Sequence, residues 1–182
     1  MSRIPSVPLG EEKPDHFILG ENKAEIKISS AEENRNLALS MVKQARYGIN
    51  IFTQDMDDAV FNNDEFENHV FNLATRHPDT KVRILVQDST PAIKKGHRLI
   101  RIAQKLTSSV FIKNPEEIYK NDKSAFITID GIGMLHRPRA DSYNYEALVS
   151  FMSPRRVEKL DEYFYKIWAQ SIRDQKVRRL CI

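Results

Sequence analysis

Hydrophobic residues recur at two spacings along this chain, every second residue in short runs and every third or fourth residue in longer ones. The first spacing predicts strands and the second predicts amphipathic helices. Residues 24–28 and 49–53 are runs of the first kind. Between them lies an apolar stripe at helical spacing, made of Leu37, Met41, Val42 and Ala45. Ser30 followed by Glu33 has the pattern of a capping box, so we expect this helix to begin at Ser30.

The alternation of strands and helices continues through the rest of the chain. A second helix is predicted over residues 64–77, and a third over residues 90–106 with Thr90 as its cap and Pro91 at its first position. Ser153 is the expected cap of the last helix. Further strands are predicted at residues 81–87, 109–113, 125–129, 133–136 and 147–152, with one helical turn at 115–119.

The order of these elements predicts the fold class. Strands that alternate with helices form parallel pairs through crossover connections, and the late strands add antiparallel pairs. We therefore expect an α/β fold with a mixed, mostly parallel sheet flanked by helices. Residues 1–22, rich in Pro and Gly, are predicted to be an extended N-terminal arm. Residues 23–172 form the predicted domain and residues 173–182 a basic C-terminal tail.

The composition limits the class of protein. Of the 182 residues, 41% are hydrophobic and 29% are charged, which fits one globular domain with its own core. No apolar run reaches the roughly 18 residues that a membrane-spanning helix needs, and the first residues lack the apolar core of a secretory signal. Cys181 is the single cysteine, which argues against an internal disulfide. We expect a reducing, cytoplasmic location.

The charges are unevenly distributed along the sequence. The net charge is +3, but the N-terminal half is acidic and the C-terminal half is basic. Such an asymmetry indicates either an anionic partner or complementary faces of one domain or of an oligomer.

Residues 123–131 combine an apolar strand with an Asp-Gly turn, and a second strand follows at once. Asp-Gly between two hydrophobic runs is typical of a tight hairpin, which favours a turn role for Asp130. The segment also resembles the signature strand of the phospholipase D superfamily, in which His, any residue, Lys, four residues and Asp precede a Gly. Aligned on Asp130, this chain has Lys123 at the His position and Ala125 at the Lys position.

The resemblance implies a phospholipase D-like lobe from about Ala24 to Ala169. It also implies that catalysis is lost, because the family's chemistry needs a His nucleophile and a Lys that neutralises the phosphate oxygens. Lys123 is protonated at neutral pH, and Ala125 can fill neither role. A single lobe further implies a homodimer, since active relatives bring two signature strands together. No cofactor is implied.

Three other segments resemble an uncharacterised bacterial domain, phospholipase D-like in fold, that is sometimes attached to acetyltransferases. They are residues 85–88, 96–99 and 103–108. This likeness adds a possible protein partner, an acetyltransferase encoded separately.

Cationic side chains form two candidate ligand-binding groups. If residues 90–106 are one helix, His97 and Arg101 share a face of it, and Arg98 lies on a neighbouring face. Such a row holds phosphates by charge, although a solvated outer helix face has the same pattern. The second group flanks the expected cleft of the signature strand and favours a phosphate-bearing ligand or a nucleic acid; it consists of Lys123, Arg137 and Arg139.

Acidic residues and one histidine supply weaker candidates. Asp55, Asp57 and Asp58 follow a strand at the edge where α/β sheets gather ligands, so they suit a divalent cation. The alternatives are that they cap a turn or pair with basic groups nearby. His136 follows the hairpin and is the one plausible substitute for the missing nucleophile, with Asp130 as its companion. An ordinary hydrogen-bonded histidine is the alternative there.

Three functions from different classes fit these features. The first is a catalytically degenerate phospholipase D-like domain with a binding or assembly role. The second is a phosphodiesterase or nuclease with a rearranged site around Asp130 and His136. The third is a protein-interaction module. The missing His and Lys favour the first, and therefore a protein that is not an enzyme.

Overall fold

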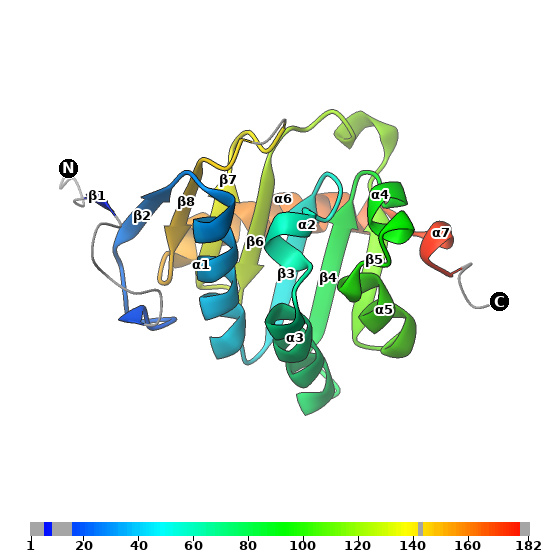
Figure 1. Ribbon diagram of the computed structural model, residues 1–182, viewed down its shortest axis with the longest axis horizontal. Coiled ribbons are helices and arrows are strands. Elements are labelled where there is room, and N and C mark those ends of the chain that lie inside the picture. Colours follow the sequence, from blue (N-terminus) through cyan, green and yellow to red (C-terminus); the bar gives the residue numbers. More distant parts are fainter. Residues whose placement is uncertain (1–5, 9–15, 142–143, 179–182) are drawn as a thin grey trace.

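The computed structural model describes residues 6–8, 16–141 and 144–178. Within them the chain forms a nine-stranded sheet with the order β1-β2-β8-β7-β6-β3-β4-β5-β9 (Figure 1). The strands are β1 (Ser6–Pro8), β2 (Glu25–Ile28), β3 (Gly48–Thr53), β4 (Lys81–Val86), β5 (Val110–Asn114), β6 (Ala125–Ile129), β7 (Gly133–Arg137), β8 (Ala147–Ser150) and β9 (Ile172–Arg173).

The sheet is mixed, as predicted, but it is mostly antiparallel and not mostly parallel. Parallel pairing joins β1 to β2, β3 to β4 and β4 to β5. The other five pairings among the described strands are antiparallel. A parallel pair needs a crossover of a dozen or more residues, usually a helix. The connections around β6, β7 and β8 carry no such helix, so these strands form a meander beside β3.

Helices cover both faces of the sheet. In Figure 1, α1 to α5 lie in front of it and α6 lies behind it. The larger core lies under α1 to α5, and a smaller aromatic core that includes Phe52, Phe126 and Phe164 lies under α6. None of the described helices is long and apolar enough to cross a membrane. The helices are α1 (Ala31–Gln44), α2 (Asp58–Phe61), α3 (Asp64–Arg76), α4 (Thr90–Lys94), α5 (Arg98–Lys105), α6 (Pro154–Gln170) and α7 (Gln175–Arg178), with a 3₁₀ turn at Glu117–Tyr119.

The first long helix begins where the sequence predicts. The Ser30 hydroxyl accepts a hydrogen bond from the Glu33 amide at 3.2 Å, and the Glu33 carboxylate accepts one from the Ser30 amide at 3.0 Å. Both halves of the capping box are therefore present. The Ser29 amide donates to the same carboxylate and holds the pKa of Glu33 below its usual value.

Residues 90–106 form two helices in place of the single helix predicted. α4 ends two residues before Gly96 and α5 begins two residues after it, and Gly96 has a φ of +64°. This left-handed conformation interrupts the helix. The His97 side chain then caps α5 by accepting a hydrogen bond from the Leu99 amide at 3.2 Å. Thr90 is the first residue of α4 and not its cap, so the predicted row of cations along one helix does not form.

Both ends of the described chain contribute to the sheet. β1, which lies in the segment predicted to be an extended arm, pairs with β2. Phe17 of the same segment stacks on Phe151 with ring centroids 5.3 Å apart. At the other end, β9 pairs with β5, and α7 lies in the segment predicted to be a basic tail. Residues 1–5, 9–15 and 179–182 of these segments lie outside the described residues.

Candidate functional site

The Asp-Gly hairpin joins β6 to β7 at one end of the signature strand. Asp130 and Gly131 have φ values of +53° and +69°, the left-handed conformations that the favoured two-residue hairpin turn requires. The Asp130 carboxylate accepts hydrogen bonds from three consecutive backbone amides, those of Arg46, Tyr47 and Gly48, at 2.7, 2.8 and 2.9 Å. The turn role predicted for Asp130 is confirmed, and the same carboxylate fastens the loop between α1 and β3.

The opposite end of the signature strand carries a buried arginine. Ala125, at the position of the family's Lys, pairs with Arg137 across β6 and β7. The Arg137 guanidinium forms an ion pair with Asp57 at 2.5 Å and donates to the Asn144 carbonyl at 2.5 Å. It also lies over the Tyr145 ring, 4.4 Å from the centroid. Arg137 is only 5% exposed, so its charge is taken up inside the protein.

A small cavity lies beside this ion pair. Asn34, Thr53, Ala125 and Arg137 line it together with apolar residues, and its volume is about 20 Å³. That space is enough for about one water molecule. Asn34 Oδ1 and Arg137 Nε are buried there without a hydrogen-bond partner among the described residues. The centre is polar but nearly filled, and a phosphodiester group does not fit into it.

Two exposed cations lie near the end of the signature strand. Lys123 Nζ is 3.4 Å from one carboxylate oxygen of Asp141, and Arg139 Nε is 3.8 Å from the other. Both cations share a single carboxylate, which leaves this rim, Lys123, Arg139 and Asp141, with one net positive charge. The structure therefore brings Lys123 and Arg139 together but gives Arg137 a separate, internal partner.

His136 lies on the other face of the sheet. Its ring meets Phe126, a member of the core under α6, edge-on at 6.2 Å, and burial lowers its pKa. In the register of the hairpin His136 is opposite Phe126, four residues before Asp130. Four residues of extended strand span about 13 Å. The structure does not bring Asp130 and His136 into one site.

The acidic loop after β3 has separate partners for each carboxylate. Asp57 pairs with Arg137, and Asp55 accepts a hydrogen bond from the Asp57 amide at 3.1 Å. Asp58 accepts one from the Asn62 side chain at 2.7 Å and pairs with Lys95 at 3.5 Å. Across the part of the chain that the structure describes, no group of three or more His, Cys, Asp or Glu side chains is arranged to hold a metal ion.

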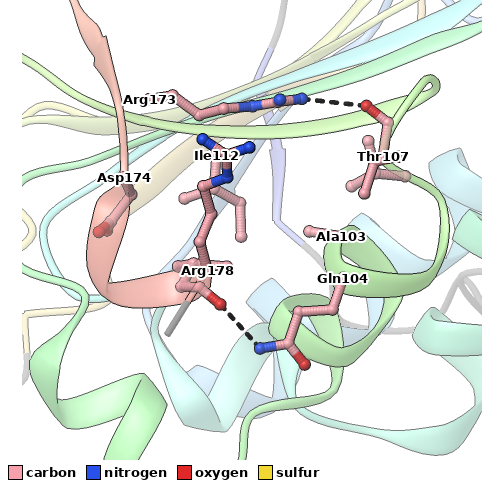
Figure 2. A pocket seen from close by; sticks show the side chains of 9 residues that line it. Ala103, Gln104, Thr107, Ile112, Arg173, Asp174 and Arg178 are labelled. Carbon is pink, nitrogen blue, oxygen red and sulfur yellow. Dashed lines mark hydrogen bonds between the residues drawn. The ribbon is translucent and has the colours of Figure 1, made fainter. Parts of the chain in front are cut away.

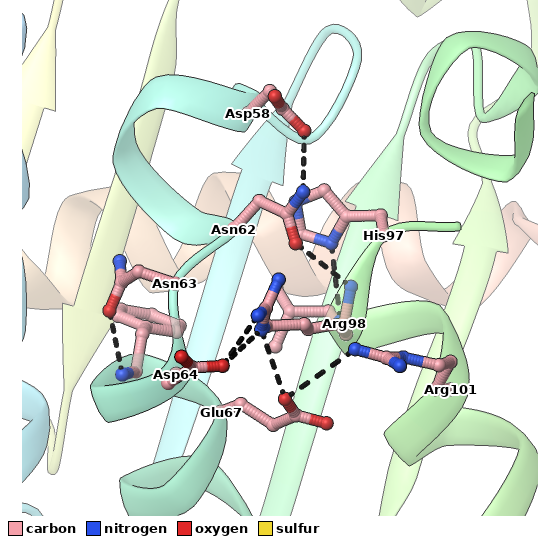
Figure 3. Close-up of polar contacts among 10 residues, drawn as sticks. Asp58, Asn62, Asn63, Asp64, Glu67, His97, Arg98 and Arg101 are labelled. Carbon is pink, nitrogen blue, oxygen red and sulfur yellow. Dashed lines mark hydrogen bonds and ion pairs between the residues drawn. The ribbon is translucent and has the colours of Figure 1, made fainter. Parts of the chain in front are cut away.

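The candidates at the start of α5 are also neutralised within the chain (Figure 3). Arg98 contacts Asp64 through Nε at 2.8 Å and Nη2 at 2.5 Å, and its Nε lies 3.2 Å from Glu67. Arg101 reaches Glu67 at 3.7 Å. His97 is 1% exposed, and burial lowers its pKa to about 4. Arg98 and Arg101 therefore join α5 to carboxylates of α3.

Sequence reasoning missed several side-chain contacts around the signature strand. Asn34 donates to the Tyr145 carbonyl at 2.7 Å, across 111 residues of chain. Asp122, just before the signature strand, accepts from the Tyr163 hydroxyl at 2.6 Å and from the Ser124 side chain at 2.7 Å. Burial and the Asp122 carboxylate raise the pKa of Tyr163. The contacts of Asn34 with Tyr145 and of Asp122 with Tyr163 join segments that are distant in the sequence, and no local sequence motif predicts them.

Comparison with models of known protein families assigns this sequence to a family. A family model described as "Domain of unknown function (DUF7931)" matches residues 30–180. The chain belongs to this family. No curated protein matches the sequence.

Solved structures show that the DUF7931 chain has the phospholipase D-like fold. It is similar to Nuc, a phospholipase D family member from Salmonella typhimurium (TM-score 0.58, 15% identity, 82% of this chain and 98% of that chain). It is also similar to NucT from Helicobacter pylori (TM-score 0.58, 16% identity, 82% and 98%). A third match is the phosphatidylserine synthase of Haemophilus influenzae Rd KW20 (TM-score 0.54, 12% identity, 87% and 41%).

The archaeal chromatin protein TrmBL2, described as having a novel mode of DNA binding, also matches (TM-score 0.59, 16% identity). The match covers 82% of this chain but 54% of TrmBL2. The DUF7931 chain thus spans nearly all of the two Nuc-type chains and about half or less of the other two proteins. At these identities the likeness shows the fold alone.

Proposed function

We propose that this DUF7931 domain is a catalytically degenerate phospholipase D-like domain with a binding or assembly role. The observation that carries the proposal is the closed centre at the signature strand. Ala125 stands where the family has its Lys, and the buried pair of Arg137 and Asp57 lies across from it. The remaining cavity of about 20 Å³ admits no substrate.

The chemistry of the remaining side chains supports the same reading. A covalent mechanism needs a nucleophile in hydrogen-bond reach of a base, with an electrophilic clamp for the developing charge. Arg137 stays protonated in proteins and already donates to two acceptors. Lys123 is an exposed cation paired with Asp141. Neither residue is a plausible nucleophile, whereas the rim of Lys123 and Arg139 attracts a phosphate-bearing ligand without cleaving it.

An activity assay tests the loss of catalysis. We expect no release of nitrophenol from bis(4-nitrophenyl) phosphate and no cleavage of single- or double-stranded DNA above the buffer rate. His136→Ala serves as the matched control, because it removes the one substitute nucleophile considered for a phosphodiesterase. Turnover by the wild-type chain that disappears in His136→Ala would contradict the proposal and establish the enzyme.

The assembly role is proposed to be a homodimer that brings two signature strands together. The 3₁₀ turn Glu117–Tyr119, which precedes this strand in the sequence, exposes Ile118, which is 77% accessible. We expect light scattering to give twice the chain mass of 21.1 kDa. Ile118→Asp should shift the protein toward monomer, while Phe71→Asp on α3, at an apolar residue elsewhere that is 42% accessible, should not. A monomer at every concentration would refute the dimer and leave the binding role to be tested separately.

A further inference from the structure

A second hollow lies at the edge of the sheet formed by β5 and β9, away from the signature strand. It is enclosed by β5, α5 and the C-terminal segment with β9 and α7, and its volume is about 260 Å³ (Figure 2). Its floor is apolar and buried, and consists of Ala103, Val110, Ile112 and Val177. Two strands, β3 and β4, separate β5 from β6, so the hollow is independent of the site considered above.

Two arginines at this hollow have no carboxylate partner. Within the described residues, neither Arg173 nor Arg178 lies in ion-pair distance of an acidic side chain, unlike Arg98 or Arg137. Arg173 Nη2 donates to the Thr107 carbonyl at 3.0 Å, which orients its guanidinium. In Figure 2 the Arg178 side chain extends toward that of Arg173. Both arginines line the same hollow, where like charges raise each other's electrostatic energy and a bound anion would lower it.

The acid nearest in sequence is not available to them. Asp174 is 1% exposed, and its carboxylate accepts hydrogen bonds from the Asn114 side chain at 3.1 Å and from the Lys176 amide at 2.9 Å. Figure 2 shows this carboxylate turned away from the two guanidinium groups.

The opposite wall of the hollow is fixed by a hydrogen bond between helices. The Gln104 side-chain amide donates to the Val177 carbonyl at 2.8 Å and thereby ties α5 to α7. Because α5 and α7 are held together, the apolar residues that they contribute to the floor keep their relative positions. The volume lies just below the about 300 Å³ at which drug-sized ligand pockets begin, so the occupant is small.

We propose that this hollow binds a small organic anion, with its oxyanion head held by Arg173 and Arg178 and its apolar body on the floor at Ala103 and Ile112. Planar guanidinium forks match both carboxylate and phosphate monoester heads. The apolar floor selects ligands that carry a ring or short chain over free inorganic ions. This site does not depend on the role proposed for the signature strand.

Calorimetric titration of the full chain with phenyl phosphate, benzoate and inorganic phosphate tests the proposal. We expect phenyl phosphate, benzoate or both to bind at least tenfold more tightly than inorganic phosphate, because only they use the floor. Arg178→Gln should weaken that binding about tenfold, the effect of losing one hydrogen bond to a charged group. The comparison between the two organic probes identifies the preferred head group.

Lys176→Gln is the matched control, because it removes one positive charge from the same helix. The Lys176 side chain contacts Thr90 and Asp88, away from the hollow. The affinity of the Lys176→Gln variant for the organic probes should stay within twofold of that of the wild type. Equal weakening in both variants, equal affinity for all three probes, or no binding at millimolar concentration would each overturn the proposal. Arg173→Gln provides a second test should circular dichroism find Arg178→Gln unfolded.

Discussion

The signature-strand centre and the hollow between α5 and α7 both contain arginine, but they treat its charge in opposite ways. Arg137 is 5% exposed, and Asp57 neutralises it. Arg173 and Arg178 are exposed and form no ion pair with a carboxylate within the described residues. A buried cation must be paired because an isolated charge in the interior is very unfavourable. The comparison teaches that Arg137 is paired inside the protein, while Arg173 and Arg178 remain without an ion-pair partner among the described residues.

Breaking the buried pair should have the largest effect. Asp57→Ala leaves the Arg137 guanidinium buried without its counter-charge, and we expect the free energy of unfolding to fall by about 3–5 kcal/mol. Urea denaturation measures the loss. The double variant Asp57→Ala with Arg137→Met removes both charges and should recover most of it. A loss below about 1 kcal/mol in the single variant would mean that the pair is not structural, and the comparison would fail.

Introducing the lysine of the phospholipase D signature should have the next largest effect on stability. Ala125→Lys places a second cation beside Arg137 in a centre with about 20 Å³ to spare. Overpacking and like charge together should cost about 2–4 kcal/mol of stability. Lys123→His, at an exposed position, should change stability by less than about 0.5 kcal/mol. Tolerance of Ala125→Lys without loss would show that the centre is open after all.

The local elements were predictable, but their pairing was not. Ser30 and Glu33 predict the first helix because the capping box is formed by residues three apart. The Asp-Gly pair predicts the hairpin for the same local reason. The position of β6 beside β3 depends on contacts between residues about 75 apart, which no periodicity encodes. A mostly parallel sheet was therefore the wrong inference from a largely correct succession of elements.

The candidate site divides along the same line. The sequence shows directly that the signature His and Lys are missing, and this limits the chemistry. It does not show that Arg137 forms an ion pair with Asp57, 80 residues away. The sequence alone therefore suggests a ligand-binding role for Arg137. Gly96 was the one local signal of the broken helix, since a glycine inside a helical pattern is a weak point. Arg173 and Arg178 were assigned to a tail because short elements such as β9 and α7 have little periodicity.

His97 tests the effect of burying a titratable side chain that forms no ion pair among the described residues, and the expected change in stability is smaller. Burial lowers its pKa from 6.5 to about 4; the Asp58 charge opposes this shift, while Arg98 and Lys95 add to it. Between these two pH values the unfolded chain binds more protons, so stability should fall as the pH drops from 6.5 to 4, by at most about 1.4 kcal/mol per pH unit. Urea denaturation at several pH values measures the slope.

His97→Asn is the control for this titration. Asparagine also caps helices through a side-chain oxygen but does not titrate. The variant should lose part of the slope between pH 6.5 and 4 while remaining folded at pH 7.5. Identical slopes in the two proteins would mean that His97 protonates as easily in the folded state as in the unfolded one, against the burial argument.

Removing one exposed carboxylate should have the smallest effect on stability and the most informative effect on binding. Asp141 is the shared partner of Lys123 and Arg139 at the rim of the signature strand. Asp141→Asn should leave the urea midpoint unchanged, because exposed ion pairs contribute little. It also turns the rim into a second place with unpaired cations, like the hollow between α5 and α7.

Fluorescence anisotropy with a labelled single-stranded oligonucleotide then separates two accounts of the rim. If pairing with Asp141 is what limits anion binding there, Asp141→Asn should bind the oligonucleotide several-fold more tightly at low salt, and the gain should vanish at high salt. Asp79→Asn removes the same charge from an exposed position between α3 and β4 and should give a much smaller gain. Equal gains would mean that the oligonucleotide reads only the net charge, and the contrast between paired and free cations would then explain nothing about binding.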